Sequence, residues 1–476
     1  MKLSIKIISL TLAVLMPLIM LFSVAFIAKS EYDESFVASL DDKLDRLYSI
    51  DEKKIVIIGC SSAAFGYDSS IIEKYLGMPV VNMGIYAALG TKVMLDLSRD
   101  AIGEGDIVIV APEMDKQTFS LYFSAATTLR ALDGSPEYLF DVPKENKAAL
   151  LGAGFGFASE KLSYKVFGSP EFMGIYNSKS FNELGDIGVH RAENIMFDYY
   201  DPNVKIRVNE DIVEPEFIEY LNDYADYCSS VGAQLYFEFC PMNRLAFDDE
   251  SNTEIARREF ARFLDDALDF PIIASDIEDY VYDEGYFYDS NLHLNSAGVI
   301  KHTVNVTRDL LLELGIAKAV TEEIPDAPSL PERDVRFFGE DENAQFFRYE
   351  KLSNGAYMIA GVKEEYLSEK TLTVPLGYDG YKVVAIGRGA FSGSSVETLI
   401  VTEDTNVRSF ENGAFSGAGL LKHLYIYYPE CIDINPPDDV VGTAEGFKVH
   451  IPVSSGYETD AYGWGDLGLR FEYIYD

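Results

Sequence analysis

Residues 54–62 read Lys-Ile-Val-Ile-Ile-Gly-Cys-Ser-Ser, and this stretch decides the fold class of the larger part of the chain. An apolar run of β-branched residues that ends at Gly59 is typical of a strand buried on both faces of a parallel sheet. Further strand candidates follow along the chain, at residues 79–81, 106–110, 234–237 and 271–273. Such strands, separated by amphipathic segments, predict an α/β fold with a parallel sheet.

Amphipathic segments between these strands predict the helices that cover the sheet. The candidates are a stalk at about 34–48 and helices at 69–76, 91–101, 215–230, 253–267 and 296–314. The last of these closes the domain, so we expect one α/β domain over residues 52–315. Within it, residues 116–214 are too many for a plain connection between two strands and predict a partly helical insertion or lid.

The N-terminus predicts a membrane anchor. Lys2 and Lys6 precede an apolar run at residues 7–28, which is long enough to cross a bilayer. Acidic residues follow Lys29, so the positive-inside rule puts the N-terminus in the cytoplasm and the domains outside the cell membrane. The alternative is a signal peptide cleaved at Ser23-Val24-Ala25, which would give a secreted protein. In either case the domains lie outside the cytoplasm.

The composition excludes several classes of partner and cofactor. The chain has 78 acidic and 39 basic residues and a net charge of −39, which repels nucleic acid and anionic lipid headgroups. Any contact with a membrane should therefore come from an apolar segment. The cysteines lack metal-finger spacing and are predicted to be buried small hydrophobes: Cys60, Cys228, Cys240 and Cys431. No metal or nucleotide motif is present, and we expect no cofactor.

A second domain follows a linker at residues 321–344, which begins with a stretch rich in proline and acidic residues. Gly-Ala-Phe-Ser-Gly occurs at 389–393 and again at 413–417. An apolar run follows each copy, at 396–401 and at 421–426. A repeat of about 24 residues with one strand in each unit is typical of a solenoid.

Residues 345–476 resemble the BspA-type leucine-rich repeats of bacterial surface proteins, whose units carry an Ala-Phe-x-Gly turn before an apolar strand. The segments at 449–452 and 462–464 resemble the closing cap of such arrays. Only two clear repeats are visible, fewer than the three or so that an array needs, so we expect the flanking β segments to complete it. The resemblance implies a β-solenoid that binds a protein or surface partner.

Three blocks of the α/β domain carry the residue types needed for hydrolysis by a serine. Ser61 follows the first strand, at the sheet edge where α/β folds bind ligands, and the next strand ends in Asn-Met-Gly at 82–84. The third block, Asp-Ser-Asn-Leu-His-Leu-Asn at 289–295, precedes the closing helix. Such hydrolysis needs a hydroxyl, a base, an acid that orients the base, and N–H groups that bind the oxyanion.

In this order the blocks resemble the SGNH (GDSL-like) hydrolases, over residues 52–315 without much of the insertion. The resemblance implies a flavodoxin-like three-layer sandwich with Ser61 as the nucleophile and the N–H groups of Ser61 and Gly84 in the oxyanion hole. It also implies a closing Asp-x-x-His-Leu-Asn block, with His293 as the base and Asp289 as the orienting acid.

Each block also has a structural interpretation. Ser61 can lie in a polar loop between strand and helix, Gly84 can end a strand, and Asn295 or Ser296 can be a helix N-cap. The other histidines of the domain are His190 and His302, which fall in the insertion and on the closing helix. His293 is therefore the natural base.

One region departs from the family pattern. Family members often carry Gly-x-Asn-Asp after the next strand, and its asparagine donates a hydrogen bond to the oxyanion. Here the strand ends in Ala-Pro-Glu-Met-Asp at 111–115, and the Glu113 carboxylate cannot donate unless it is protonated. Divergent SGNH-like envelope proteins, such as those of teichoic-acid D-alanylation and alginate acetylation, also relax this block.

Asn243 and Arg244 follow a later strand and should border the same crevice. Asn243 is a candidate hydrogen-bond donor, and Arg244 is a candidate partner for an anionic substrate. The alternative is a loop that only caps the strand. Glu113 is a further candidate substrate contact.

The resemblance implies an esterase or O-acyltransferase that acts on acyl (acetyl) esters of envelope or extracellular glycans. Hydrolysis and transfer share one acyl-enzyme and differ in whether water or a sugar hydroxyl attacks it. The alternative is an inert surface adhesion or scaffold protein that binds partners through its repeats. The retained Ser61, Asp289 and His293 favour the enzyme, and Glu113 favours the scaffold.

Overall fold

The protein is described here from a computed structural model. It describes Met16 and residues 28–168, 174–196, 198–201, 204–248, 250–330, 334–352, 354–411, 413–428, 432–434, 444, 446–452 and 470–474. The predicted anchor at 7–28 lies outside these residues except for Met16 and Ala28, and Cys431 lies outside them too. In the described part of the chain, no helix combines the length and the apolar character that crossing a membrane requires.

The chain divides into two compact units. The first comprises Met1–Ile195 and Ile206–Leu330, and the second comprises Met196–Lys205 and Pro331–Asp476. The first unit thus contains the predicted domain at 52–315 except residues 196–205, and the second contains the repeats. A division within the predicted linker agrees with its composition, but the assignment of residues 196–205 to the second unit has no counterpart in the sequence patterns.

The first unit is built on a parallel sheet of four strands in the order β2-β1-β3-β4. Their bounds are β1 (Ile55–Gly59), β2 (Val80–Asn82), β3 (Ile107–Ala111) and β4 (Gln234–Phe237). Gly59 pairs with Ala111, so β1 and β3 end side by side at the same sheet edge. Phe237 forms a further parallel bridge with Ile272, which brings in the fifth predicted strand segment.

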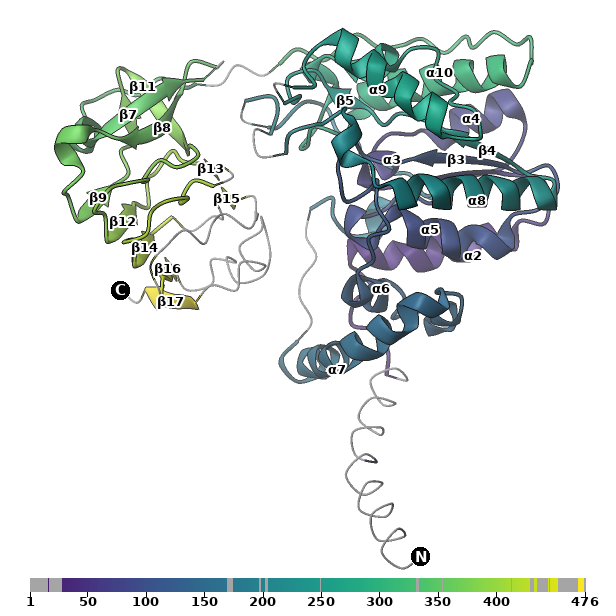
Figure 1. Ribbon diagram of the computed structural model, residues 1–476, viewed down its shortest axis with the longest axis horizontal. Coiled ribbons are helices and arrows are strands. Elements are labelled where there is room, and N and C mark those ends of the chain that lie inside the picture. The colour runs from purple at the N-terminus through teal and green to yellow at the C-terminus, as the bar shows by residue number, and fades with distance from the viewer. Residues whose placement is uncertain are drawn as a thin grey trace, which may run out of the picture. The chain divides into compact units, whose positions relative to one another are not determined.

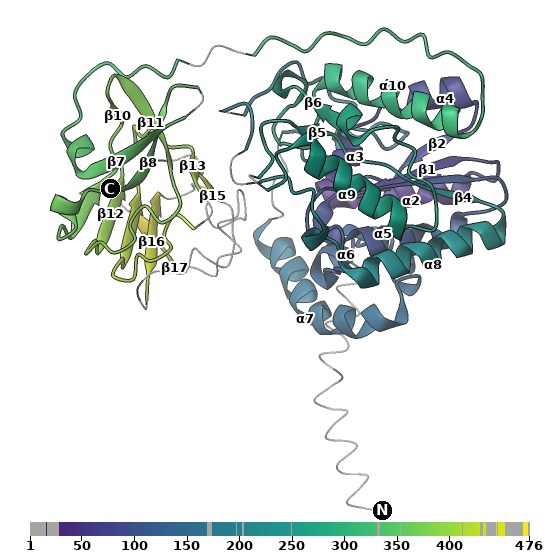
Figure 2. The ribbon, with the colours of Figure 1, turned by 45° about the horizontal axis from the view of Figure 1, so that its top comes forward.

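Helices cover both faces of this sheet, with α5 and α8 on one side and α4 and α10 on the other (Figures 1 and 2). The helical segments outside the insertion are η1 (Phe36–Ala38), α2 (Ser39–Ser49), α3 (Ser61–Ala64), α4 (Ser69–Leu76), η2 (Ala87–Leu89), α5 (Thr91–Ser98), η3 (Arg99–Ala101), α8 (Pro215–Val231), α9 (Glu254–Ala267), η7 (Ile277–Tyr280), η8 (Glu284–Tyr286) and α10 (Ser296–Glu313). A short parallel pair, β5 (Met242–Asn243) with β6 (Val281–Tyr282), lies apart from the main sheet.

The insertion is partly helical, as predicted. Its helical segments are α6 (Ala125–Ala131), η4 (Pro136–Phe140), α7 (Lys144–Phe167), η5 (Ser178–Ser180) and η6 (Glu210–Ile212). Its segment at residues 184–185 is attached to the sheet. The Asn82 N–H donates to Leu184 O, and the buried Lys43 ammonium donates to the carbonyls of Asn82 and Gly185.

The second unit consists mainly of two sheets. One has the order β17-β16-β14-β12-β9, in which all strands are parallel. The other has the order β15-β13-β11-β8-β7, with β10 paired to β11; within it, β15 to β8 run parallel and β7 is antiparallel to β8. The elements are η9 (Glu342–Phe346), β7 (Phe347–Lys351), β8 (Tyr357–Val362), η10 (Glu364–Tyr366), β9 (Thr371–Thr373), β10 (Gly377–Tyr378), β11 (Tyr381–Ile386), β12 (Thr398–Val401), β13 (Ser409–Phe410), β14 (His423–Ile426), β15 (Asp433–Ile434), β16 (Lys448–Pro452) and β17 (Arg470–Ile474).

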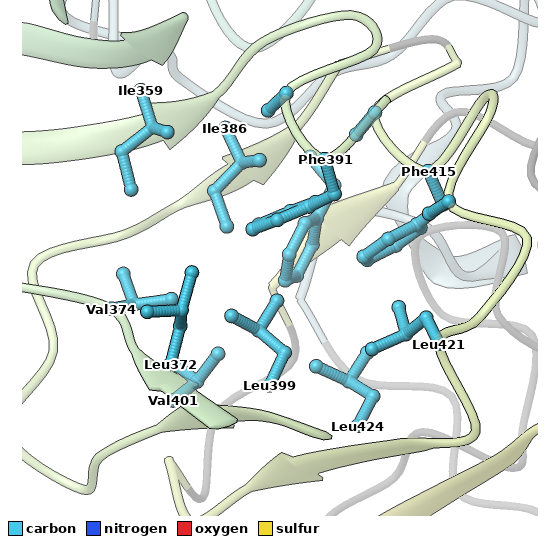
Figure 3. Packing of buried hydrophobic residues seen from close by; sticks show 14 of the residues in the cluster. Ile359, Leu372, Val374, Ile386, Phe391, Leu399, Val401, Phe415, Leu421 and Leu424 are labelled. Atoms are coloured by element: carbon cyan, nitrogen blue, oxygen red, sulfur yellow. The ribbon is translucent and has the colours of Figure 1, made fainter. Parts of the chain in front are cut away.

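The repeated Gly-Ala-Phe-Ser-Gly segments lie against each other in this unit. Gly389 N–H donates to Gly413 O at 2.8 Å, and both glycines have positive φ values that favour a residue without a Cβ. Phe391 and Phe415 stack with ring centroids 6.0 Å apart, and Figure 3 shows them above the leucines of neighbouring strands. The first unit is therefore a mixed α/β structure and the second is mainly β, and both contain parallel sheets. The chain as a whole belongs to the α/β class.

Candidate active site

Ser61 lies at the turn between β1 and α3, at the carboxyl edge of the sheet. The preceding turn is tightly packed: a Cβ on Gly59 would lie 2.7 Å from both Ala111 O and Ala63 Cβ. Glycine at this position therefore lets α3 begin directly against the ends of β1 and β3. The Ser61 hydroxyl is presented at the start of this short helix.

The structure brings Ser61, His293 and Asp289 together in one hydrogen-bonded chain. His293 Nε2 lies 2.8 Å from Ser61 Oγ, and His293 Nδ1 lies 2.9 Å from Asp289 Oδ1. The imidazole is buried and stacks on Phe65, with centroids 4.1 Å apart and an interplanar angle of 10°. An ionised Asp289 favours the tautomer with the proton on Nδ1, which leaves Nε2 free to accept the Ser61 proton.

Three residues separate Asp289 from His293, one more than in the Asp-x-x-His pattern that the block resembles. The carboxylate still reaches the ring because the chain folds back on itself here. Phe287 and Leu294 form an antiparallel bridge, and Tyr288 N–H donates to His293 O at 2.9 Å. The longer spacing is therefore compatible with the pairing of acid and base.

Asn295 fixes this loop to the closing helix. It is the N-cap of α10 and accepts from Gly298 N–H at 3.0 Å, while its amide donates to the carbonyls of Gly285 and Phe287. The structural interpretation of Asn295 as a helix cap is thus correct, and the same cap holds the backbone on which His293 stands.

Tyr176 and Arg191 support the same loop from the insertion, and the sequence patterns did not indicate either. Tyr176 Oη donates to Asp289 Oδ2 at 2.7 Å. Burial alone would raise the pKa of the Asp289 carboxyl, but the hydrogen bonds from His293 and Tyr176 outweigh burial and lower this pKa below its usual value. The buried Arg191 guanidinium donates from Nε to Leu294 O at 2.9 Å and lies over the Phe65 ring.

Gly84 lies beside α3, where a Cβ would come within 2.5 Å of Ala64 N. Its N–H, which we expected to face an oxyanion, donates instead to Asn82 Oδ1 at 2.8 Å. The Asn82 amide is held in turn by Ala63 O and Asp186 Oδ1. In this arrangement Gly84 acts through close packing, and its N–H already has an acceptor.

Glu113 lies directly against the nucleophile. Its buried carboxylate accepts from Ser62 N–H at 2.8 Å through Oε1, and the same oxygen lies 3.1 Å from Ser61 Oγ. Its surroundings are acidic as well: burial, and then the Glu113 charge, raise the pKa of Asp115 to about 6. Where family members carry an amide donor, this chain carries a hydrogen-bond acceptor.

Asn243 and Arg244 are engaged within the protein. Asn243 is buried at the end of β5, where its N–H donates to Asn291 O and its Oδ1 accepts from Leu245 N–H. Arg244 is paired with two acids, Asp283 at 2.6 Å and Glu284 at 2.9 Å. Asn243 therefore braces the His293 loop through the backbone, and the Arg244 guanidinium is partly engaged by these two acids.

The other histidines and the described cysteines of this unit are not part of the hydrogen-bonded chain of Ser61, His293 and Asp289. His302 is buried on α10 beside Glu238, at 3.2 Å, and His190 Nδ1 lies 3.0 Å from Ser296 Oγ. Cys60, Cys228 and Cys240 are buried free thiols, as predicted. Within the described part of the chain, no three histidine, cysteine or carboxylate side chains gather closely enough to hold a metal ion.

No family model, curated protein or solved structure matches this chain.

Proposed function

We propose that this protein is a membrane-anchored, extracytoplasmic serine esterase or O-acyltransferase of the SGNH type that acts on acyl esters of envelope or extracellular glycans. The observation that carries the proposal is the hydrogen-bonded chain from Ser61 Oγ through the His293 ring to Asp289. A nucleophile, a base and an orienting acid within hydrogen-bond reach of one another form the arrangement that acyl transfer by a serine requires.

In the proposed reaction, Ser61 Oγ attacks the ester carbonyl carbon while its proton passes to His293 Nε2. Asp289 stabilises the imidazolium through Nδ1–H. Collapse of the tetrahedral intermediate breaks the bond to the leaving alkoxide, which takes the proton from Nε2, and an acyl-Ser61 remains. Water or a second sugar hydroxyl then attacks this acyl-enzyme, with His293 acting as the base again.

The finer fold assignments belong to the same proposal. The strand order β2-β1-β3-β4, extended by the bridge to Ile272, supports a flavodoxin-like SGNH domain. In the second unit, the register pairs Leu399 with Leu372 on one side and with Leu424 on the other. Equivalent leucines on successive parallel strands support leucine-rich repeats of the BspA type, for which we propose a protein or surface partner.

Specific contacts favour an inert surface adhesion or scaffold protein as the second candidate. The Glu113 carboxylate is close to Ser61 Oγ and occupies Ser62 N–H, and Gly84 N–H is occupied by Asn82. An oxyanion formed on a carbonyl attacked by Ser61 would thus meet the Glu113 carboxylate, and the Gly84 N–H, one of the two donors that the resemblance implies, is engaged elsewhere. In this alternative the repeats provide the function.

The test is turnover of an acetylated model ester by the full chain in detergent or nanodiscs, together with labelling by a fluorophosphonate probe. Ser61→Ala should lower turnover by about 10³-fold or more, since loss of one triad member usually costs several orders of magnitude in rate. Ser62→Ala is the matched control. It removes the hydroxyl of the residue next to Ser61, which is buried without a hydrogen-bond partner among the described residues, and it retains the Ser62 N–H.

Equal turnover in wild type and Ser61→Ala would remove Ser61 from the mechanism. If the wild-type chain neither turns over esters, with or without a glycan acceptor, nor takes up the probe, the scaffold function is the better assignment.

A further inference from the structure

Helix α7 exposes an apolar face that its own domain does not cover. Leu151 is 72% exposed, Phe155 57% and Val166 73%. At 3.6 residues per turn these side chains share one side of the helix with four small or apolar residues. Those residues are Ala148, Gly152, Ser159 and Leu162. Lys144 lies on the same side at the first residue of α7, so the face carries no charge from Ala148 to Val166, which is most of the length of the helix.

The opposite face of α7 is anchored in the protein. Leu150, Phe157 and Ala158 are buried, and α6 packs along the helix. Lys161 is fully buried and forms an ion pair with Asp133 at 2.5 Å. Since the helix is apolar on both sides, only one of which its domain covers, the exposed face needs a second apolar environment.

The chain leaves its predicted anchor next to this helix. Lys161 Nζ donates to Ala28 O at 2.8 Å and Lys165 Nζ donates to Lys29 O at 3.1 Å. Tyr32 then packs on Phe157, with ring centroids 6.0 Å apart. Ala28 is the last residue of the apolar run at 7–28, so α7 is attached to the point at which the chain would emerge from the bilayer.

We propose that the exposed face of α7 lies in the interfacial layer of the membrane that residues 7–28 anchor. This inference rests on the proposed anchoring of the chain. An uncharged helix face can partition among lipid headgroups and acyl chains, to a depth of about 5–10 Å. The net charge of −39 disfavours anionic lipids, so apolar contact is the interaction that this surface offers.

Membrane docking of α7 also has a consequence for the candidate active site. Beyond Tyr32, Ser35 pairs with Asn177 and Phe36 packs on Tyr176, with ring centroids 5.6 Å apart. Tyr176 is the residue that donates to Asp289. A few residues of chain thus connect the membrane surface to the catalytic acid, so the site is held close to the bilayer, where membrane-proximal acyl esters are the accessible substrates.

The test places an environment-sensitive fluorophore on single cysteines of the full chain, reconstituted in zwitterionic vesicles. The parent carries Cys431→Ser, because the three described cysteines are buried and unreactive. Leu151→Cys, Phe155→Cys and Val166→Cys report on α7. Ile255→Cys is the matched control, since Ile255 is also apolar, helical and 69% exposed, but lies on α9.

The α7 labels should shift their emission to the blue and lose intensity when the lipids carry a quencher near the headgroup, more than with a quencher near the acyl terminus. The Ile255 label should do neither. Vesicle flotation of the same samples tests the anchor separately.

If the chain floats with the vesicles but the α7 labels behave like the Ile255 label, the docking proposal is wrong while the anchor stands. A blue shift without quenching by lipid would mean that protein, such as a second copy of the chain, covers this face, and would also overturn the proposal. If the chain does not float, the anchor and the docking proposal fail together.

Discussion

The Ser61 hydroxyl has one proton and two acceptors within reach, His293 Nε2 at 2.8 Å and Glu113 Oε1 at 3.1 Å. In the proposed reaction, only the hydrogen bond to His293 prepares Ser61 for attack, because His293 takes this proton. An ionised Glu113 competes for the proton and would also repel the oxyanion. In the proposed reaction, the Glu113 carboxylate therefore opposes the transfer of this proton to His293.

Replacement of this carboxyl tests the competition. Glu113→Gln retains an oxygen for Ser62 N–H but removes the negative charge and supplies an amide donor. We expect kcat on an acetylated model ester to rise by about tenfold or more, since two unit charges about 4 Å apart interact by about 4 kcal/mol at an effective dielectric constant of 20. Steady-state kinetics of the full chain, with Ser61 labelling as a second readout, measures the change.

Asp115→Asn provides the control for Glu113→Gln. It removes a nearby carboxylate that accepts hydrogen bonds from the N–H groups of Gln117 and Thr118. A comparable rise in kcat in Asp115→Asn would assign the effect to the general acidity of the region. A fall in kcat in Glu113→Gln would mean that Glu113 assists the reaction, and would contradict the competition.

At the scale of single elements, the strands and helices of the first unit could be predicted because each has a local signal. β1 and β3 are continuous apolar runs, α4 begins after the cap Asp68 and ends at Gly77, and α8 begins at a proline and ends at a glycine. His293 and Asp289 could be found in the same way, because both precede a helix in one short block.

The rest of the site depends on contacts that have no local signal. Tyr176 and Arg191 come from irregular parts of the insertion, and only the folded chain brings them to the His293 loop. The Gly84 N–H donates to the Asn82 side chain, and the periodicity of a strand does not predict such a side-chain hydrogen bond. The ion pairs of Arg244 likewise need acids about 40 residues away in sequence.

The repeated turns give a prediction about the stability of the second unit. Phe415 is buried, and its ring contacts those of Phe391, Phe410 and Phe447. Phe415→Ala should lower the free energy of unfolding of this unit by about 3–5 kcal/mol, because a cavity replaces the ring. With a urea dependence of about 1–3 kcal/mol per molar, the unfolding midpoint should fall by about 1 M or more.

The only tryptophan of the chain, Trp464, belongs to this unit, so its fluorescence can follow the transition in the full chain. Phe338→Ala is the control, because it removes an exposed ring of the same unit and should leave the midpoint unchanged. Equal midpoints for Phe415→Ala and wild type would contradict the role of Phe415 in the core.

At the scale of the whole molecule, charge and hydrophobicity are distributed unequally. The chain carries a net charge of −39, but residues 7–28 contain no acidic residue. Such a chain is kept in solution by its acidic surface and is held to a membrane only where apolar side chains are presented. The proposed membrane topology therefore depends on the segment at residues 7–28, and under this proposal both units should lie on the same side of the membrane.

Protease added to intact protoplasts tests this topology. Residues 317–330, which include the start of the linker, have neither helix nor strand. The first cut should therefore fall there and release the second unit, and further digestion should remove the first unit. A tag after Asp476 would be lost, while a cytoplasmic marker protein stays intact until the membrane is permeabilised. Protection of the tag in intact protoplasts would contradict the positive-inside argument. Recovery of the untreated chain in the medium, without its first residues, would instead support the cleaved signal peptide, because the apolar segment at 7–28 is the proposed anchor of the protein.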